Sequence, residues 1–333
     1  RWVINPSLEV WLVFRSSQIA WLLPTTVWSL LIRVGLRRGA LQPDEARLVL
    51  VAPEEEAVKA LKAWQLTPTR TMPRWLTPEE AALQPSPLVF AVSPSFRHFP
   101  EYRQLLEELE SRDPRECGLT TPLALAERQL ERIPPSLLPE PWISYEEIPC
   151  NAIFSPQRQL KRVADVLLAL LLLAVTTPLV MIAALLIWVE DKGSVFYIQE
   201  RSGWLGHPFK LVKLRTMKTA LPDEPISWTV PGDQRITRVG HWLRRTRVDE
   251  LPQLINVVVG DMSLIGPRPE RPELEFELEA KIPHYRKRHW MRPGLSGWAQ
   301  VCAPYASSVE DSELKLSYDL FYLKNFSTWL DLL

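Results

Sequence analysis

The sequence of 333 residues contains little cysteine. Its three cysteines, Cys117, Cys150 and Cys302, are far apart, form no CxxC pair and show no Cys/His spacing typical of a zinc site. A disulfide framework is therefore not expected, and a reducing compartment fits this cysteine usage better.

Glycine is scarce as well, with 12 residues, and no glycine-rich phosphate loop occurs where a dinucleotide fold would need one. A short apolar strand is expected at 47–52, but AlaProGluGluGlu at 52–56 follows it in place of GxGxxG. Three adjacent acids would repel a pyrophosphate, so nicotinamide or flavin binding is not expected.

The formal net charge is zero, but the charges are unevenly distributed. Residues 41–150 hold 18 acidic and 11 basic side chains, whereas residues 201–250 hold 10 basic and 5 acidic ones. A basic segment in a neutral chain favours anionic ligands or an anionic membrane face. A solvated basic surface would have the same composition.

The longest uncharged run spans residues 166–189 and has a proline near its middle. Its 24 residues are enough to cross a hydrocarbon core roughly 30 Å thick. Pro178 removes a helix hydrogen bond and disfavours helix at Thr177. The run is therefore either a kinked span or a re-entrant helix over 161–190 that breaks at Thr177-Pro178 and turns back. A basic collar precedes it and marks that side as cytoplasmic, comprising Arg158, Lys161 and Arg162.

The chain before this run divides by composition into three segments. A marginal apolar stretch at 16–32 predicts a membrane or interfacial helix region over 1–40. Apolar strands that alternate with amphipathic helices predict a small, doubly wound, Rossmann-like α/β unit over 41–135. Its expected role is structural, sensory or oligomeric, with a homodimer among the outcomes. Closely spaced prolines then predict a semi-rigid linker over 136–160.

The chain after the run carries several dense polar motifs. An alternating strand is expected at 194–201, and a second strand at 209–217 would place Lys213 and Arg215 on one face. The segment 292–301 is expected to be a loop entering a strand. These features predict a compact α/β domain over 191–333.

Two adjacent carboxylates, Asp249 and Glu250, stand out in this domain. An isolated Asp-Glu pair would ordinarily complement a helix dipole. Here arginines, including Arg247, precede the pair, and neighbouring cations favour an ionised, nucleophilic aspartate. The second carboxylate is of the type that holds Mg²⁺. Arg268 lies between two prolines, so its guanidinium is pre-positioned for bidentate phosphate binding. Together these residues predict a site for a diphosphate.

These motifs resemble those of the monotopic phosphoglycosyl transferases, also called bacterial sugar transferases. The resemblance covers residues 157–333. It rests on the basic collar with Asp165, the Thr-Pro pair in the apolar helix, and six sequence stretches: KLRTM, DQRITRVG, DELPQL, GDMSLIGPRPERPE, RPGLSGWAQV and KLSYDLFYLKN. The upstream α/β unit resembles the regulatory domain of the longer family members in its layout.

The resemblance implies a membrane-associated α/β enzyme with a re-entrant helix bent at Thr177-Pro178. It implies that Asp249 is the nucleophile, that Glu250 holds Mg²⁺ and that Arg268 binds phosphate, with Lys213, Arg215 and Arg247 as further phosphate-binding cations. The implied reaction transfers a sugar-1-phosphate, with a hexose expected, from a UDP-sugar to undecaprenyl phosphate through an aspartyl-phosphosugar, and releases UMP.

The implied location is the bacterial inner membrane, with the catalytic domain facing the cytoplasm. The implied partners are the UDP-sugar, undecaprenyl phosphate and the lipid bilayer, and no nucleic acid is expected. Two alternatives stay open at this stage. One is a silent scaffold of the same fold, against which the intact Asp249, Glu250 and Arg268 argue. The other is a glycosyltransferase that moves only the sugar, which would normally carry a DxD motif that the sequence lacks.

Overall fold

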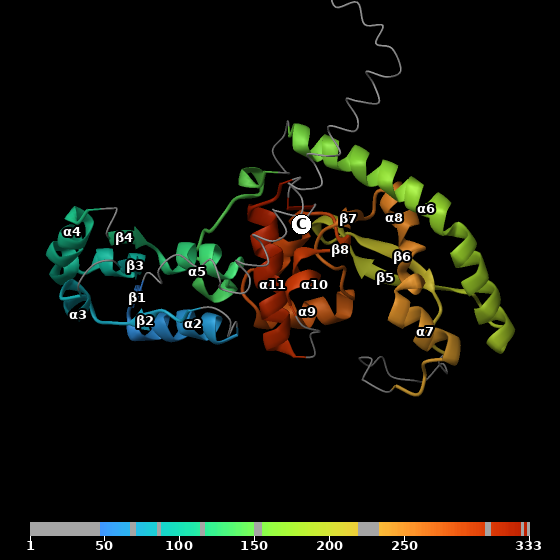
Figure 1. Cartoon of the computed structure of the whole chain (residues 1–333), viewed down its shortest axis with the longest axis horizontal. Helices are drawn as coiled ribbons and strands as arrows, with labels where there is room; N and C mark the ends of the chain where they lie inside the picture. The colour runs from blue at the N-terminus through green and yellow to red at the C-terminus, as the bar shows by residue number, and fades with distance from the viewer. Residues whose placement is uncertain are drawn as a thin grey trace, which may run out of the picture.

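The structure is a computed structural model. It describes residues 47–66, 71–84, 88–113, 117–149, 155–218, 233–303, 308–327 and 330–331. Figure 1 shows an upstream α/β part beside a larger downstream part, over which one long helix runs. The apolar stretch at 16–32 lies outside the described residues, so the membrane or interfacial region over 1–40 stays a prediction.

The upstream part is built on a sheet of four parallel strands in the order β2-β1-β3-β4. Both predicted strands are confirmed, as β1 (Arg47–Val51) and β3 (Leu88–Val92). Alternate side chains of β1 enter different apolar clusters, so both faces of the sheet are covered. The other elements are α2 (Glu54–Gln65), β2 (Arg74–Trp75), α3 (Pro78–Ala82), η1 (Pro94–His98), η2 (Pro100–Tyr102), α4 (Arg103–Ser111), β4 (Cys117–Thr120) and α5 (Pro122–Leu130).

A carboxylate occupies the edge of this sheet where a nucleotide fold would bind phosphate. Glu56 accepts hydrogen bonds from the hydroxyls of Ser93 and Ser95, which follow β3. The topology of the sheet switches between β1 and β3, and this is the edge at which doubly wound folds bind ligands. The parallel α/β layout is therefore present, while the narrower Rossmann-like assignment stays a prediction.

The proline-rich segment, which includes η3 (Pro135–Leu137) and η4 (Tyr145–Glu147), packs against the downstream part. Ile133 and Ile148 are fully buried in one apolar cluster with residues of α11 (Val309–Lys324). The Ile133 N–H also donates to the Ser317 carbonyl of α11 at 2.8 Å. These contacts attach the segment to α11. A semi-rigid linker, as predicted for 136–160, would need no such packing.

The long helix is α6 (Pro156–Asp191), and it is continuous through Thr177 and Pro178. The prediction that the helix breaks at this pair is therefore wrong, because the helical backbone continues through it. Proline removes only one backbone donor, and the flanking turns keep their bonds. The hydroxyls of Thr176 and Thr177 donate to the carbonyls of Leu172 and Leu173 at 2.7 and 2.6 Å, a pattern that favours bending. Figure 1 shows α6 curving over the downstream part.

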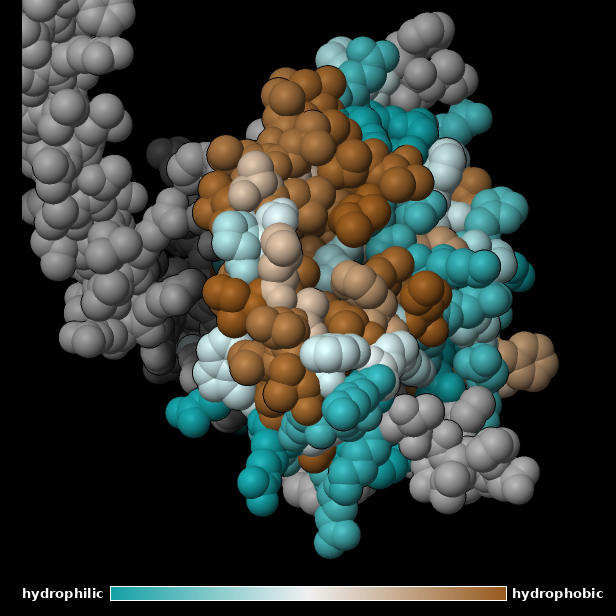
Figure 2. Space-filling view, turned by 90° about the vertical axis from the view of Figure 1, so that its right-hand side faces the viewer, coloured by the Kyte–Doolittle hydropathy of each residue, from teal (hydrophilic) through white to brown (hydrophobic). Residues whose placement is uncertain are grey.

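One side of α6 is apolar and buried against the downstream part. Ala169 packs with Leu254 and Val257, and Ala183 and Ile187 pack in a second cluster further along. The opposite side is exposed, and Figure 2 shows apolar side chains gathered over this face of the molecule. Within the described residues, α6 is the one helix long and apolar enough to cross a membrane.

The downstream part consists of two short two-stranded sheets with helices packed around them. An antiparallel pair, β5 and β6, packs near α8, and a short parallel pair, β7 and β8, packs near α11. The segment at 292–301 was predicted to be a loop that enters a strand. The strand β8 instead lies within the predicted loop, and a helix follows it, so the strand expected at the end of the segment is wrong. The elements are β5 (Phe196–Ser202), η5 (Trp204–Gly206), β6 (Pro208–Leu214), α7 (Arg238–Thr246), η6 (Val248–Glu250), α8 (Gln253–Val259), β7 (Ser263–Ile265), α9 (Pro272–Lys281), η7 (Tyr285–Trp290), β8 (Gly294–Ser296) and α10 (Trp298–Cys302).

Candidate active site

The two adjacent carboxylates lie in a tight turn between α7 and α8. Arg247 ends α7 with a φ of 58°, in the left-handed region, and this reversal starts the short helix η6 that carries both acids. Asp249 is buried, with 6% of its surface exposed. The turn therefore presents the pair from a fixed backbone, with Asp249 facing inward.

Asp249 carries an unsatisfied acceptor. Its Oδ1 atom is buried, and no described residue donates a hydrogen bond to it. Burial raises the pKa of Asp249, and the neighbouring Glu250 raises it further, while Lys213 and Arg244 oppose the shift. Among the described residues this oxygen keeps an unused acceptor that a ligand could occupy, and the two cations favour the charged form of the carboxylate.

Glu250 is held by two arginines. The Arg268 guanidinium donates to its Oε1 at 2.7 Å, and Arg247 donates to the same oxygen at 3.2 Å. Burial would raise the pKa of Glu250, but Arg268, Arg247 and Lys213 bring that pKa below its usual value. Glu250 is therefore ionised at neutral pH and orients the arginine that the sequence predicted as a phosphate ligand.

Further cations surround the pair. Lys213 of β6 lies opposite Tyr197 of β5, with its ammonium 5.1 Å from the ring centre. Burial is the main reason that the pKa of Lys213 falls to about 8, and Arg201 lowers it further, whereas Asp249 opposes the shift. Arg244 of α7 donates to the Thr216 hydroxyl at 2.8 Å. A buried cluster with this excess of positive charge suits a multiply charged anion such as a diphosphate.

The loop that carries Arg268 is fixed by a close approach between two backbones. A Cβ at Gly294 would lie 2.1 Å from the Gly266 nitrogen, so only glycine fits there. The Gly266 N–H donates to the Ser296 carbonyl, and the Gly294 N–H donates to the Pro267 carbonyl, both at 2.8 Å. The two Gly/Pro-rich motifs found in the sequence are thus the two sides of one rigid junction.

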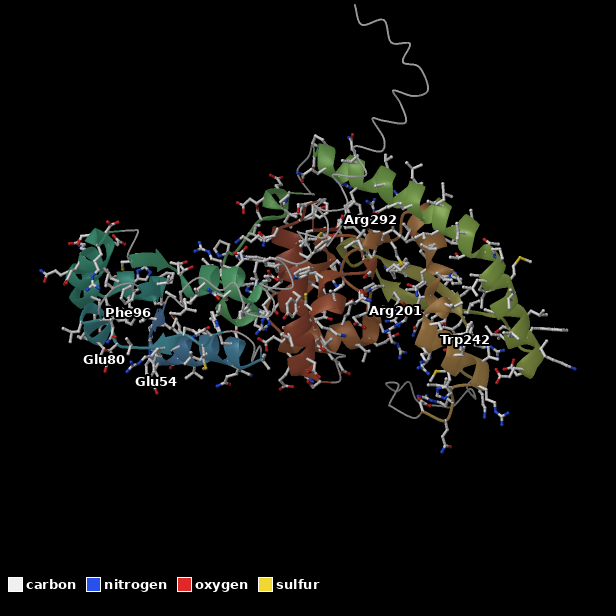
Figure 3. All side chains as sticks on the ribbon, in the orientation of Figure 1. Glu54, Glu80, Phe96, Arg201, Trp242 and Arg292 are labelled. Atoms are coloured by element: carbon white, nitrogen blue, oxygen red, sulfur yellow. The ribbon has the colours of Figure 1, made fainter. Side chains whose placement is uncertain are left out.

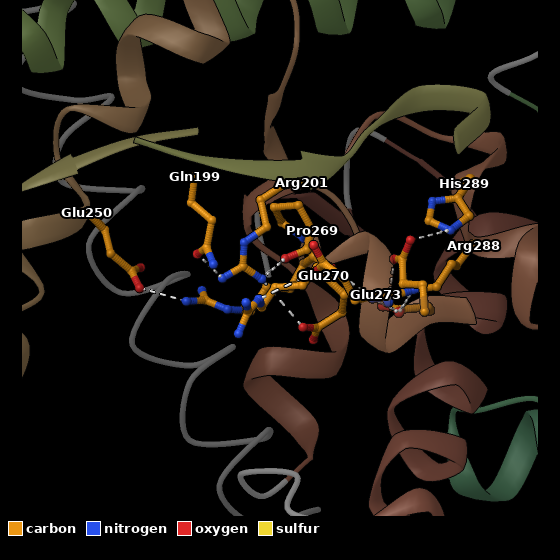
Figure 4. Close-up of polar contacts among 12 residues, drawn as sticks. Gln199, Arg201, Glu250, Pro269, Glu270, Glu273, Arg288 and His289 are labelled. Carbon is orange, nitrogen blue, oxygen red and sulfur yellow. Dashed lines mark hydrogen bonds and ion pairs between the residues drawn. The ribbon is translucent and has the colours of Figure 1, made fainter. Parts of the chain in front are cut away.

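A buried ionic cluster supports the same loop from behind. Arg288 donates to the Arg268 carbonyl at 2.8 Å and pairs with Asp319 of α11 at 3.0 Å. Arg288 also lies 3.7 Å from Glu275 of α9, whose other oxygen is 3.4 Å from His289. Figure 4 shows Glu250 at one end of this network, Arg288 and His289 at the other, and Arg201 with Glu270 between them. Removing one member of a buried pair typically costs about 3–5 kcal/mol, because the remaining charge is left unpaired, so the Arg268 loop depends on all members of this cluster being present.

The structure brings five of the predicted site residues together: Asp249, Glu250, Arg268, Lys213 and Arg247. It does not bring Arg215 to them. Arg215 lies beyond the end of β6, is buried, and donates to Asp191 at the C-terminal end of α6. Thr177 and Pro178 lie in the middle of the long apolar helix α6, and they are not part of the group of site residues.

The family described as bacterial sugar transferase matches residues 156–333, which is more than half of the chain. The chain belongs to the bacterial sugar transferase family.

Several relatives of the chain carry names that state a reaction. A UDP-N-acetylgalactosamine-undecaprenyl-phosphate N-acetylgalactosaminephosphotransferase of Aeromonas hydrophila is 43% identical over 174 residues, covering 52% of this chain and 41% of the relative. A UDP-glucose:undecaprenyl-phosphate glucose-1-phosphate transferase of Caulobacter vibrioides is also 43% identical, covering 52% of this chain and 65% of the relative. The Escherichia coli protein of the same name is 38% identical, covering 53% of this chain and 38% of the relative. The chain thus spans less than two thirds of each of these relatives.

The sequence predicted Arg244 among the arginines that precede the acidic pair, but it did not predict two further arginines of this bacterial sugar transferase, Arg201 and Arg288, as site residues. Arg201 donates to the Pro269 carbonyl at 3.1 Å and lies 3.7 Å from Glu270, so it holds the loop beyond Arg268. A signal for Arg201 was available, because it lies on the same face of β5 as Tyr197, the partner of Lys213. For Arg288 no local signal existed, since its role depends on Asp319, which is 31 residues away.

The candidate site offers two carboxylates, Asp249 and Glu250, to a magnesium ion. Among the described residues, no three His, Cys, Asp or Glu side chains form a group that could hold a metal by themselves. Mg²⁺ in phosphate enzymes needs fewer protein ligands, because one or two carboxylates and the substrate phosphates suffice. The unsatisfied Asp249 Oδ1 and the adjacent Glu250 carboxylate meet that requirement. The residues present therefore fit a metal that arrives with its substrate.

The pH dependence of kcat/KM is expected to have an alkaline limb set by Lys213. Its pKa of about 8 means that the ammonium is charged below this pH and is lost as the pH rises through it. We expect kcat/KM to fall about tenfold per unit above this pH, since kcat/KM reports the free enzyme. In Lys213→Arg the guanidinium stays charged, so the limb should move to a much higher pH. An unchanged limb in Lys213→Arg would assign it to another group.

Proposed function

We propose that this protein transfers a sugar-1-phosphate, with a hexose as the expected sugar, from a UDP-sugar to undecaprenyl phosphate. The observation that carries the proposal is the buried Asp249, whose free Oδ1 lies in a cluster of cations beside Glu250. The reactions in the names of the relatives are consistent with it. A silent scaffold would have no need for an unsatisfied, buried carboxylate.

The first step is a displacement at the β-phosphorus of the UDP-sugar. The Asp249 carboxylate forms a new P–O bond while the bond from this phosphorus to the oxygen of UMP breaks, and UMP leaves. The sugar phosphate is then held as an aspartyl phosphate. Arg268 and Lys213 would neutralise charge on the phosphoryl oxygens, which is the main contribution a protein makes to phosphoryl transfer.

The second step repeats the displacement with a lipid acceptor. A phosphate oxygen of undecaprenyl phosphate attacks the same phosphorus, the bond to Asp249 breaks, and the carboxylate is regenerated. The product is undecaprenyl diphosphate sugar. Glu250, with Asp249 Oδ1, would hold Mg²⁺, which when bound supplies positive charge to the diphosphate. Arg247 and Arg268 keep Glu250 ionised for that purpose.

We also propose that α6 is re-entrant in the sense that it enters one leaflet and leaves on the same side. A helix of 36 residues is roughly 54 Å long, longer than a bilayer core. Both of its ends contact the same downstream part: Arg162 donates to the Val257 carbonyl at 2.6 Å, and Glu190 accepts from the Arg238 N–H at 2.9 Å. A helix that crossed the membrane would carry these ends to opposite sides. Its curvature and its exposed apolar face support insertion from the cytoplasmic side of the inner membrane.

Labelling at two positions tests this topology. In a variant without the three natural cysteines, we expect Glu147→Cys, before α6, and Glu200→Cys, after it, to react equally with a membrane-impermeant maleimide. Both should react in inside-out vesicles and neither in intact spheroplasts. Reaction at the two positions from opposite sides would mean that α6 crosses the membrane and would end this part of the proposal.

UMP release from a panel of UDP-sugars tests the reaction. We expect release with at least one UDP-hexose, formation of a lipid-linked sugar when undecaprenyl phosphate is added, and loss of both activities in chelator with recovery on addition of Mg²⁺. Release of UDP in place of UMP would indicate a transferase that moves only the sugar. Full activity in chelator would remove the metal role assigned to Glu250.

A further inference from the structure

A proline-rich segment outside the family match packs on the elements that hold the Arg268 loop. This segment, residues 133–148, is called the strap below, and the match begins only at residue 156. In Figure 3 the strap is the green ribbon that leads from α5 past α11 toward the start of α6. Its two ends, Ile133 and Ile148, are fully buried in one apolar cluster with residues of α11. A connector that only joined two parts of the chain would not need to bury its ends.

The middle of the strap contacts a lysine of η7. The Lys287 ammonium lies 5.1 Å from the ring centre of Trp142, in the strap, and 5.1 Å from the ring centre of Trp290. Tyr145 of the strap meets the Trp290 ring edge-on, with the two ring centres 5.8 Å apart. A cation within about 6 Å of an aromatic ring is attracted to it, and Lys287 has two such rings. Trp142 and Tyr145 therefore hold η7 from its outer side.

The residue that follows Lys287 is Arg288, which supports the active-site loop. Arg288 donates to the Arg268 carbonyl and to the Tyr285 hydroxyl, both at 2.8 Å. Tyr285 is buried in the same apolar cluster as the two ends of the strap. The contact of the strap with Lys287 thus acts on a short helix whose next side chain is hydrogen-bonded directly to the Arg268 loop.

The strap also contacts the element that carries the ionic partner of Arg288. Arg288 pairs with Asp319 of α11 at 3.0 Å. Two residues earlier on α11, the Ser317 carbonyl accepts a hydrogen bond from the Ile133 N–H at 2.8 Å. The strap therefore touches both elements whose charges meet at Arg288. Because protein interiors are close-packed, a shift of η7 or α11 is passed on to the loop.

We propose that Trp142 is a positioning residue of the active site, which acts through Lys287 and Arg288 to hold the Arg268 loop where its guanidinium meets a substrate phosphate. The catalytic unit of this chain then begins with the strap and not with α6. This inference rests on the proposed function, because it assumes that Arg268 binds phosphate.

Trp142→Ala is expected to lower kcat/KM about tenfold, because a small displacement of a binding group is costly even when the substituted residue is remote from the chemistry. The acid limb of the kcat/KM profile should also move to higher pH. Burial raises the pKa of Glu250, and Arg268 opposes this rise most strongly, so a displaced Arg268 leaves Glu250 protonated up to a higher pH. A merely loosened fold would lower kcat/KM without moving this limb. Trp142→Phe keeps a ring beside Lys287 and should recover most of the loss.

The same contact can be removed from its other side without loss of apolar packing. Lys287→Gln keeps most of the side-chain stem but has no charge, so the same loss and the same shift of the acid limb are expected. Lys287→Arg keeps a cation between the two rings and should recover most of the activity. Trp75→Ala, at a ring that is 40% exposed in the upstream part, is the matched control and should change neither quantity. Unchanged kcat/KM and acid limb in Lys287→Gln would overturn the inference, as would an equal effect in Trp75→Ala.

A double variant separates this inference from the proposed function. If Lys287 acts through Arg268, adding Lys287→Gln to Arg268→Gln should lower kcat/KM less than twofold further, whereas independent effects would multiply. A full further loss would mean that the strap acts by another route, and it would overturn this inference alone. Normal activity in Arg268→Gln would overturn the phosphate role of Arg268 and this inference with it. All variants are assayed as the full chain, at a temperature at which circular dichroism shows them folded.

Discussion

Asp249→Asn is expected to abolish UMP release, by a factor on the order of 10³ or more. The amide has the same shape as the carboxylate but no negative charge, and it cannot form the aspartyl phosphate on which both steps depend. Asp249 is buried, and Glu250 is the carboxylate that acts on its pKa, but Glu250 is held by Arg268 and Arg247 and is not placed to replace it as the nucleophile. UMP release at saturating UDP-sugar is the measurement.

The matched control for this variant is the same Asp→Asn substitution at a residue outside the candidate active site. Asp113→Asn, in the upstream part, should retain full activity. Detergent extraction from membranes should be the same for both variants and the unmodified protein, because α6 is untouched. Without acceptor, the intact mass of the unmodified protein should increase by one sugar phosphate, and that of Asp249→Asn should not. Turnover that persists in Asp249→Asn would remove Asp249 as the nucleophile.

Arg268→Gln is expected to lower kcat/KM about 10²- to 10³-fold, equivalent to roughly 3–4 kcal/mol of transition-state stabilisation. The substitution removes a phosphate-binding charge and also the 2.7 Å bond to Glu250. Because Arg268 is the strongest influence that lowers the pKa of Glu250, its loss should raise that pKa. If Glu250 must be ionised, the acid limb of the kcat/KM profile then moves to higher pH.

The conservative variant distinguishes charge from geometry. Arg268→Lys keeps a positive charge but loses the planar fork, so an intermediate loss and a smaller shift of the acid limb are expected. Arg286→Gln removes an exposed arginine that pairs only with Glu279 in the described structure, and it should have no effect. If Arg268→Gln stays within twofold of the unmodified protein, the phosphate role of Arg268 is wrong.

The sequence correctly predicted that site residues close together in the chain also lie close together in space, because a single turn determines their geometry. Asp249 and Glu250 are adjacent, and Arg247 is close enough for the turn alone to bring it to Glu250. The proline residues on both sides of Arg268 identified a stiff loop, and the glycine-rich motif at 292–301 proved to be the surface on which this loop rests.

Two predictions from the sequence were wrong, each for a specific physical reason. Lys213 and Arg215 were expected on one strand face, but β6 ends at Leu214, and Arg215 instead pairs with Asp191 of α6. No pattern within residues 209–217 reveals that the end of a distant helix supplies this partner. The Thr-Pro pair predicted a break, yet α6 remains continuous because the cost of one missing hydrogen bond is less than that of ending the helix in an apolar face.

By itself, the sequence determined the apolar helix, the parallel strands of the upstream part and the acidic pair with its adjacent arginine, because periodicity, run length and neighbouring charges act over a few residues. Only the tertiary structure decided which cations face Asp249, that Arg288 and Asp319 hold the Arg268 loop, and that both ends of α6 bind one domain. These features depend on contacts between segments far apart in the chain, and the burial that sets their charges exists only once those segments have packed.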